Sequence, residues 1–306
     1  MPTENQPLVS VIMNCYNSAK YLREAIDSVV AQTYSNWEII FWDNQSTDES
    51  AQVYKSYCDQ RMRYFYAPEH TVLGQARNLA VEQAKGEWLG FLDCDDMWLP
   101  EKLEKQVAII NKEGPGLGLV YGQMLVITEE KERSSWNRRM AKYQTKTRLA
   151  KLPDGYIFEK LLSDNFIPLV SAMVCSVAFS RIGGINPTYK QAEDFDLFVK
   201  ITNQFQAKAV QEVIALYRVH DKNLSELQHN EAFNETIDIV CRYLPSEFAK
   251  KALTRQYVNE AVQRIRSRDV IGLLNLVKKC NGIIGLSIAF FKAVMAHLKN
   301  RLVRVR

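Results

Sequence analysis

Short apolar runs alternate with stretches of helical apolar spacing over the first hundred residues of this chain. Leu8–Met13 is an apolar, β-branched run that ends in polar residues, a pattern typical of a buried strand leading into a loop. From Leu22 to Val30, apolar side chains recur at helical spacing and predict a helix capped by Asn17 or Ser18. The same reasoning predicts strands at 38–42, 64–66 and 88–92, a helix at 75–84, and a capping box at 46–49.

Strands that alternate with helices predict a parallel sheet covered by helices on both faces. In such a sheet, ligands bind beyond the carboxyl ends of the strands. Polar residues stand directly after the predicted strands, namely Asn14, Asp43, Asn44 and the cluster that begins at Asp93. We therefore expect one crevice to collect these residues, and we expect a nucleotide to bind there.

The second half of the chain predicts a less regular arrangement. A helix at 101–111 precedes a strand at 119–127, and a basic, polar stretch at 129–148 predicts a long excursion because it lacks apolar periodicity. Mixed structure resumes at 155–219. The residues after about 230 predict helices.

The end of the chain predicts a helix with an apolar stripe and a basic surround. The stripe follows 3-4-3-4-3 spacing and consists of Ile288, Phe291, Met295, Leu298, Leu302 and Val305. Lys292 interrupts the apolar stretch too early for a transmembrane span. Such a helix can lie on an anionic membrane surface, or it can pack on the body with a solvated basic face. The sequence leaves both interpretations open.

Composition and charge narrow the class of protein. With 306 residues, 47% of them hydrophobic, the chain has room for one large domain and an appendage. From Glu231 onward it carries 14 basic and 6 acidic residues, a net charge of +8, whereas the preceding residues carry a net charge of −4. A nucleic-acid-binding protein would carry its basic surface on the folded body, so we expect no nucleic-acid partner.

The cysteines and the first residues bear on the compartment. Six cysteines are scattered singly, without a spacing suited to zinc, which predicts buried free thiols in a reducing compartment. Residues 1–7 lack the basic start and apolar run of a secretory signal. We therefore expect the folded part of the chain in the cytoplasm.

Three carboxylates occur within four residues at Asp93-Cys94-Asp95-Asp96. Because neighbouring carboxylates repel one another, a divalent cation is a plausible reason to assemble them. Mg²⁺ and Mn²⁺ prefer oxygen ligands and commonly bind through one or two carboxylates and substrate phosphates. The alternative is that these aspartates cap the helix after Pro100 and are merely solvated.

Four segments occur in order along the first hundred residues: PLVSVIMNCYN at 7–17, WDNQSTD at 42–48, LGQARN at 73–78 and FLDCDD at 91–96. In sequence, order and spacing they closely resemble glycosyltransferase family 2, whose members have the GT-A fold. Farther on, Glu193-Asp194 resembles the family's Glu-Asp motif, and 217–225 resembles its Tyr-Arg-x-His segment. The resemblance covers about residues 7–225.

The resemblance implies an α/β protein with the GT-A fold, a mostly parallel sheet flanked by helices, followed by a helical C-terminal extension. We assign residues 1–230 to the glycosyltransferase domain. Its nucleotide-binding part spans about 7–100 and its acceptor-binding part about 101–230. Residues 231–306 form the basic extension.

For the donor, the resemblance implies a nucleotide sugar held with Mn²⁺ or Mg²⁺. It places Asp95 on the metal, Asp93 near the ribose or the metal, and Asp96 in support. Residues that it places at the donor are Asn14, Tyr16, Asp43, Asn44 and Arg77, the last as a basic residue that approaches it. His220 matches a position that can approach the metal or the diphosphate; a structural loop histidine is an equal alternative.

For the reaction, the resemblance implies transfer with inversion. Asp194 is our candidate for the base that removes the acceptor hydroxyl proton, and Glu193 for its neighbour or for acceptor binding. Without the family pattern, two adjacent carboxylates before Phe195 would indicate the start of a helix.

One departure affects the choice of base. Many relatives have Asp-Asp-Gly-Ser where this chain has Asp43-Asn44-Gln45-Ser46, so the usual second acid is an amide. Asn44 still offers a carbonyl oxygen to a uracil N–H, and it adds a donor that another base can use. We expect a UDP-sugar.

The expected function is therefore sugar transfer in cell-surface polysaccharide or lipid-linked glycan synthesis. Its expected partners are a nucleotide sugar, a glycan or lipid-linked acceptor, and the inner face of the membrane, contacted by the C-terminal helix. A sugar-nucleotide nucleotidyltransferase is the alternative enzyme, but the loop at 14–17 is neither Gly-rich nor basic. A catalytically inactive nucleotide-sugar-binding protein is the other alternative, against which the intact acidic cluster weighs.

Overall fold

The computed structural model describes residues 6–128, 151–220, 229–267, 269 and 271–276. It falls into two compact units, one of residues 1–158 and 166–229, the other of residues 159–165 and 230–306. The predicted excursion at 129–148 and the predicted apolar stripe at 288–305 lie outside the described residues. The functional assignment of 1–230 and 231–306 stays a prediction.

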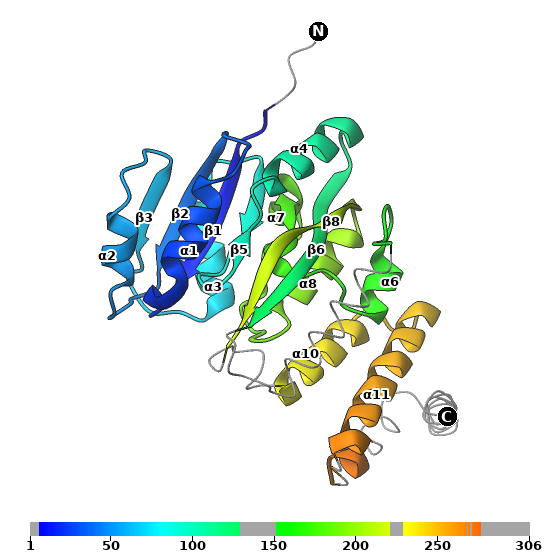
Figure 1. The fold of residues 1–306 in the computed structure, drawn as a ribbon. Coiled ribbons are helices and arrows are strands. Elements are labelled where there is room, and N and C mark those ends of the chain that lie inside the picture. The colour runs from blue at the N-terminus through cyan, green and yellow to red at the C-terminus, as the bar shows by residue number, and fades with distance from the viewer. Residues whose placement is uncertain (1–5, 129–150, 221–228, 268, 270, 277–306) are drawn as a thin grey trace, which may run out of the picture. The chain divides into compact units, whose positions relative to one another are not determined.

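The first unit contains one eight-stranded sheet in the order β3-β2-β1-β4-β7-β6-β8-β5 (Figure 1). Its first half is parallel, as predicted, with β1 between β2 and β4 and with β3 beside β2. These strands are Val9–Cys15 (β1), Trp37–Asp43 (β2), Met62–Tyr66 (β3) and Trp88–Phe91 (β4).

The second half of the sheet is mixed. Its strands are Met97–Trp98 (β5), Leu117–Thr128 (β6), Met173–Cys175 (β7) and Gln206–Val219 (β8). β7 pairs antiparallel with both β4 and β6, β5 pairs antiparallel with β8, and β6 and β8 are parallel. The sequence pattern predicted only β6 among these four. β5 and β7 are too short to show a period, and β8 lies in the stretch at 155–219 for which the sequence predicted only mixed structure.

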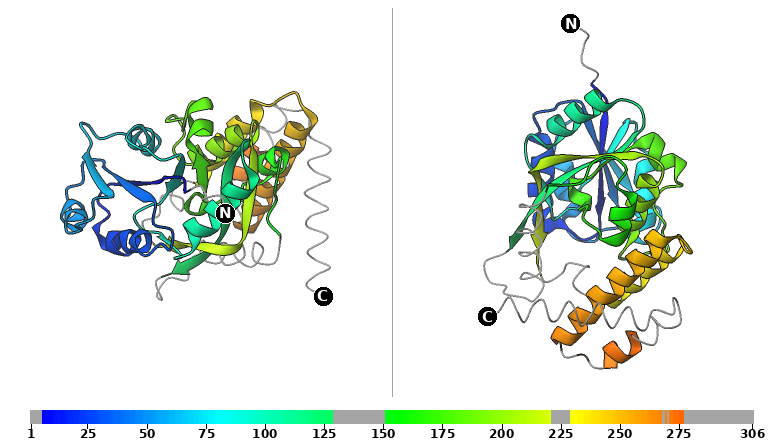
Figure 2. Two further views of the ribbon diagram at one scale, coloured as in Figure 1. Left: turned by 90° about the horizontal axis from the view of Figure 1, so that it is seen from above. Right: turned by 90° about the vertical axis from the view of Figure 1, so that its right-hand side faces the viewer.

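Helices flank the sheet on both faces (Figure 2). They are Ala19–Val30 (α1), Ser50–Lys55 (α2), Leu73–Glu82 (α3), Lys102–Glu113 (α4), Ser176–Arg181 (α7) and Glu193–Thr202 (α8), with a 3-10 turn at Leu169–Ser171. A further helix, Phe158–Ser163 (α6), belongs mainly to the second unit. The predicted apolar face of α1 is confirmed for Leu22, Ala25, Ile26 and Val29, which are buried, but not for Val30, which is 42% exposed.

The central strands are apolar along their length because both of their faces are covered. All seven residues of β2 are buried, and so are all residues of β1 except Asn14. Alternate side chains of both strands belong to one apolar core that also includes residues of α1, α4 and the second half of the sheet. This core fixes where the strands end, and it therefore fixes the polar residues that follow them.

Side chains tie the loops after β1 and β2 to each other. Asn17 Oδ1 accepts a hydrogen bond from the Thr47 N–H at 2.7 Å, and Ser46 Oγ accepts one from the Asn17 N–H at 3.1 Å. Asn17 has a φ of 51°, in the left-handed region that asparagine tolerates better than most residues. The two loops therefore form one connected rim at this end of the sheet.

Asp48 provides the helix cap that the sequence assigned elsewhere. Its Oδ2 accepts the first backbone N–H of α1 at 3.0 Å, and its Oδ1 accepts the Ser50 N–H at 3.0 Å. The predicted cap is wrong, because Ser18 occupies the N-cap position without a side-chain cap bond. The predicted capping box is also wrong, because α2 begins at Ser50 and Glu49 makes no side-chain cap bond.

The second unit is helical, as predicted for residues after about 230. Its helices are His229–Cys241 (α10) and Glu247–Ser267 (α11). Phe233 and Tyr257 meet edge to face with ring centroids 5.5 Å apart, and Arg255 pairs with Asp164 at 2.6 Å. Among the helices that the structure describes, none has the length and apolar character needed to cross a membrane.

Candidate active site

The aspartate cluster directly follows β4, and its side chains alternate in exposure. Asp93 and Asp95 are partly exposed, whereas Cys94 and Asp96 are buried. Cys94 Sγ donates a hydrogen bond to the backbone oxygen of Asn14 at 3.3 Å, which joins the ends of β4 and β1. Residues 93–96 form a turn, closed by a hydrogen bond from the Asp96 N–H to the Asp93 backbone oxygen at 3.1 Å, and this turn leaves the carboxylates of Asp93 and Asp95 on the accessible side.

The buried Asp96 anchors the cluster to β8. Its Oδ1 accepts the Arg218 N–H at 2.8 Å, and Arg218 Nε donates to the backbone oxygen of Asp95 at 2.9 Å. Burial raises the pKa of Asp96 well above its usual range, and repulsion by Asp95 adds to this effect. The alternative that these aspartates cap the next helix is wrong, because α4 begins only at Lys102 with Glu101 at its N-cap position.

Asp95 and His220 form the second contact between this loop and the end of β8. Asp95 Oδ2 and His220 Nε2 are 3.0 Å apart, and the imidazole stacks on Tyr21 with ring centroids 5.3 Å apart. Burial and the nearby charge of Asp93 raise the pKa of Asp95, while His220 opposes the rise. Two of the three predicted metal ligands therefore meet.

Asp93 faces a different partner. Arg77 Nη2 donates to Asp93 Oδ1 at 2.7 Å, and Arg77 Nη1 donates to Glu193 Oε1 at 2.8 Å. The described part of the chain accordingly contains no group of three His, Cys, Asp or Glu side chains arranged to hold a metal ion. The protein offers Asp95 and His220 together, with Asp93 turned toward the guanidinium.

Arg77 lies on α3 and only 3% of it is exposed. Burial disfavours its charged form, but Asp93 and Glu193 outweigh that effect and raise its pKa above the usual value. The guanidinium is therefore permanently charged. It joins a residue of the strand-end cluster to a residue 100 positions later in the sequence.

Glu193 and Asp194 are the first two residues of α8, so they do begin a helix, as the alternative interpretation expected. Asp194 is half-buried, and its Oδ1 accepts the Phe195 N–H at 2.6 Å. Burial raises the pKa of Glu193 to about 7 and that of Asp194 to about 6, and Arg77 opposes both shifts. A helix start and a basic carboxylate are compatible roles for Asp194.

At the ends of β1 and β2, Tyr16 and Asn14 have groups available to a ligand. Tyr16 is 53% exposed, and its ring centroid lies 4.4 Å from that of His70. Asn14 Nδ2 is buried and has no hydrogen-bond partner among the described residues. Asn14 also borders the loop that carries the aspartate cluster, because its backbone oxygen accepts the hydrogen bond from Cys94.

Asp43 and Asn44, in contrast, are occupied by the protein itself. Asp43 is fully buried, and its oxygens accept hydrogen bonds from the Ser46 N–H at 2.8 Å and the Tyr64 hydroxyl at 2.6 Å. Asn44 is 6% exposed, and its amide donates to the Thr71 backbone oxygen at 2.7 Å while accepting the Thr71 N–H at 3.1 Å. The hydrogen bonds of Asp43 and Asn44 described here are therefore made to other protein groups.

Sequence reasoning missed His70, Tyr21 and the role of Arg218. His70 Nδ1 lies 2.8 Å from the backbone oxygen of Asn44. His70 stands in the loop after the third predicted strand, so the rule that ligands bind beyond strand ends could have found it. Tyr21 has no such signal, because its apolar helical position predicts only burial.

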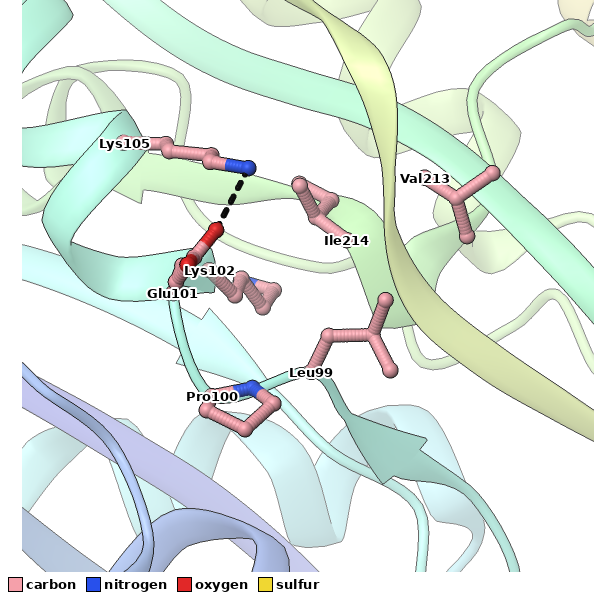
Figure 3. Close-up of a pocket in the computed structure, with 7 residues that line it drawn as sticks. All are labelled: Leu99, Pro100, Glu101, Lys102, Lys105, Val213 and Ile214. Carbon is pink, nitrogen blue, oxygen red and sulfur yellow. Dashed lines mark ion pairs between the residues drawn. The ribbon is translucent and has the colours of Figure 1, made fainter.

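A small pocket of about 170 Å³ lies at the start of α4, apart from this site (Figure 3). Its lining contains none of the predicted site residues; it consists of Leu99, Pro100, Glu101, Lys102, Lys105, Val213 and Ile214. Lys102 is fully buried and donates to Gln106 Oε1 at 2.7 Å, and burial holds its pKa well below the usual range. The hydrogen bond and the buried setting indicate a structural lysine.

Comparison with known proteins gives a consistent family signal. Residues 10–167 match the family described as Glycosyl transferase family 2. An uncharacterized glycosyltransferase of Rickettsia typhi is 34% identical over 82% of this chain and 74% of its own length. An Escherichia coli relative, named UDP-Glc:alpha-D-GlcNAc-diphosphoundecaprenol beta-1,3-glucosyltransferase, is 34% identical over 39% of this chain and 47% of its own. The chain covers only 37% of a longer Rickettsia felis relative.

Solved structures share the fold at low sequence identity. Staphylococcus aureus TarS 1–349 in complex with UDP-GlcNAc has a TM-score of 0.65 and 16% identity, over 93% of this chain and 86% of its own. The mannosyltransferase PcManGT of Pyrobaculum calidifontis, in complex with GDP-Man and Mn²⁺, has a TM-score of 0.60 and 17% identity, over 95% of this chain and 87% of its own. At these identities the likeness shows the fold.

Proposed function

The chain belongs to glycosyl transferase family 2, and from this premise we propose that it transfers a sugar from a UDP-sugar to an acceptor hydroxyl with inversion at the anomeric carbon. The observation that carries the proposal is the bridge through Arg77, which brings Asp93 and Glu193 within one side chain of each other. An inverting transfer needs a leaving-group side and an acceptor side around one carbon. The bridge supports the presence of both sides in one site.

The donor's nucleoside would bind beyond the ends of β1 and β2. The exposed ring of Tyr16 can stack on a nucleobase, and Asn14 Nδ2 can donate to a base or ribose oxygen. UDP is the first choice because TarS was solved with UDP-GlcNAc and the Escherichia coli relative is named for UDP-Glc. PcManGT was solved with GDP-Man, so guanine is the base to test against it.

Asp95 and His220 would hold Mn²⁺ or Mg²⁺, with Asp93 beside them. The pair fits a cation, because a carboxylate oxygen and an imidazole nitrogen converge at 3.0 Å next to a second negative charge. Two protein ligands leave positions for substrate phosphates, which is how these cations commonly bind. When bound, such a cation stabilises negative charge on the departing diphosphate.

Asp194 is the proposed base. Its Oδ1 is held by the Phe195 N–H, which leaves Oδ2 to accept the proton of the acceptor hydroxyl as that oxygen attacks the anomeric carbon. With a pKa of about 6, the carboxylate is ionised at pH 7 and is a stronger base than an ordinary aspartate. Glu193 has one oxygen on Arg77 and would orient the start of α8.

We place the reaction in the synthesis of a cell-surface polysaccharide or a lipid-linked glycan, on the cytoplasmic side of the membrane. The name of the Escherichia coli relative, whose acceptor carries diphosphoundecaprenol, supports a glycan or lipid-linked acceptor. Such an acceptor is compatible with contact between the basic tail and the inner face of the membrane. The family match gives no support to a sugar-nucleotide nucleotidyltransferase.

The function is tested by incubating the protein with UDP-, GDP- and dTDP-sugars, Mn²⁺ and a mixture of lipid-linked glycans, and by measuring nucleoside diphosphate release. We expect UDP release from at least one UDP-sugar, and its loss in EDTA. Asp95→Asn should lose it too, whereas Asp59→Asn, which removes a carboxylate paired with Arg61 before β3, should keep it. Donor binding without release of nucleoside diphosphate would identify an inactive binding protein. Release of GDP alone would contradict the choice of uracil as the nucleobase.

A further inference from the structure

One face of α3 packs against the segment that leads into α8. Gly74 allows a close approach, since a Cβ there would lie 3.1 Å from Ile185 Cγ2 and 3.3 Å from Pro187 Cα. Asn78 Nδ2 donates to the Ile185 backbone oxygen at 2.8 Å, and its Oδ1 accepts the Ile185 N–H at 3.0 Å. An amide that makes both bonds with one backbone residue fixes that residue in register with the helix.

Arg77 extends the same face toward the aspartate cluster. Its two terminal nitrogens each donate to a carboxylate, one of Asp93 and one of Glu193, at 2.7 and 2.8 Å. A planar guanidinium with two separate donors holds its partners at a fixed distance, which a lysine ammonium does not. The three contact residues, Gly74, Arg77 and Asn78, all come from the LGQARN segment.

The surroundings of Arg77 do not suit a phosphate ligand. Its side chain is 4% exposed, and both terminal nitrogens already face carboxylates. The negative charges of Asp93, Glu193 and Asp194 lie around it and offset its positive charge. A phosphate would need to displace one carboxylate from a buried ion pair, which leaves that carboxylate without its partner.

We propose that Arg77 and Asn78 are positioning residues, which set the start of α8, and Asp194 with it, relative to Asp93, and that Arg77 does not bind the donor. The inference rests on the proposed function for the role of Asp194 as the base. It differs from the sequence-based expectation that Arg77 approaches the donor. The LGQARN segment thus serves the acceptor side of the reaction.

The two roles of Arg77 predict different kinetics. A residue that binds the sugar donor stabilises the bound donor, so loss of that residue raises the dissociation constant of UDP and the KM of the donor. A positioning residue acts on the geometry of proton removal, so its loss lowers kcat and leaves UDP binding in place. Arg77→Lys distinguishes the two roles, because it keeps the positive charge and loses the planar guanidinium with its two separate donors.

The experiment uses the full chain with Mn²⁺ and compares Arg77→Lys with Arg63→Lys, the same change at an ion pair between Arg63 on β3 and Glu38 on β2. We expect Arg77→Lys to bind UDP within about threefold of wild type while kcat falls on the order of 100-fold. We also expect faster amide hydrogen exchange over residues 185–196. Arg63→Lys should change none of these quantities.

Asn78→Ala keeps the test valid if Arg77→Lys fails to fold, because Asn78 is uncharged and its side chain, within the described part of the chain, bonds to the Ile185 backbone. We expect unchanged UDP affinity, kcat reduced about tenfold, and faster exchange over the same residues. A UDP dissociation constant that rises tenfold or more in Arg77→Lys with kcat preserved would overturn the inference.

Unchanged exchange over 185–196 in both variants would also overturn it. Exchange and UDP binding need no turnover, so they decide the positioning role even if no sugar is transferred. If the wild-type protein turns over none of the donors, that result would contradict the proposed function but not the positioning role.

Discussion

At the scale of single residues, the two carboxylates that begin α8 differ in what holds them. Glu193 is paired with a buried guanidinium, whereas the side-chain hydrogen bond that the described residues give Asp194 comes from the Phe195 N–H. The same burial that raises both pKa values therefore leaves one of them free to change its protonation during a reaction. This difference is why we assign the proton transfer to Asp194.

The pKa of Asp194 predicts how activity depends on pH. Burial raises this pKa to about 6, and Arg77 opposes the rise. A base must be ionised to accept a proton, so kcat/KM should be constant above about pH 7 and should fall about tenfold per unit well below pH 6. A profile of kcat/KM between pH 5 and 9 measures this. A flat profile from pH 5 to 7 would contradict the role of Asp194.

Tyr16 gives the residue-scale prediction for the base of the nucleotide. Stacking of one base on an aromatic ring is worth about 1–3 kcal/mol, so Tyr16→Ala should weaken UDP binding about 5- to 150-fold. Tyr66→Ala is the matched control, since Tyr66 is 58% exposed at the end of the edge strand β3. Titration calorimetry with UDP and Mn²⁺ measures both. Equal affinities in the two variants would place the base elsewhere.

At the scale of elements, periodicity predicted the strands and helices that form the apolar core. β1, β2, β4 and α1 were predicted within a few residues, because covered strands are continuously apolar and α1 has one apolar face. Strand-end polar residues then predicted where the aspartate cluster would lie. These features could be predicted because they depend on residues that are close together in the sequence.

Contacts between distant segments could not be predicted in this way. The cap of α1 comes from Asp48 on another loop, and Arg77 pairs with Glu193 across more than a hundred residues. Asn44 fits a donor-binding pattern, yet the fold uses its amide to hold Thr71. In each case the residue type was suited to several partners, and tertiary structure selected one.

The cap of α1 gives the element-scale prediction. Removal of a side chain that accepts orphan helix N–H groups costs about 1–2 kcal/mol of unfolding free energy, so Asp48→Ala should lose that amount. Ser18→Ala, at the N-cap position itself, should lose less than about 0.5 kcal/mol because Ser18 makes no side-chain cap bond. Urea unfolding of both variants measures the difference. A larger loss in Ser18→Ala would show that the assigned cap is incorrect.

At the scale of the whole molecule, positive charge is segregated into the last quarter of the sequence. Residues from 231 on carry a net charge of +8 and the preceding residues −4. The net negative charge of residues 1–230 suits a part that binds an anionic nucleotide through a metal ion. The net positive charge of residues 231–306 suits a segment that binds an anionic surface. The tail beyond residue 276 lies outside the described residues, so this assignment stays a prediction from its sequence.

Deletion of residues 283–306 tests the membrane assignment. We expect the full chain to sediment with vesicles containing anionic lipid, the deletion variant to stay in the supernatant, and high salt to release part of the full chain. A full chain in which Lys292, Lys299, Arg301 and Arg304 are replaced by Gln isolates the electrostatic part. Equal partitioning of the full chain and the deletion variant would indicate that the tail does not bind membranes.

The central claim is that Asp194 removes the acceptor proton in a nucleotide-sugar transfer. The most direct measurement compares Asp194→Asn with wild type and Asp59→Asn for two quantities, the affinity for UDP with Mn²⁺ and the rate of sugar transfer from the donor that wild type uses. We expect Asp194→Asn to bind UDP as wild type does and to transfer sugar about 10²- to 10⁴-fold more slowly. Transfer within a few-fold of wild type would contradict the claim.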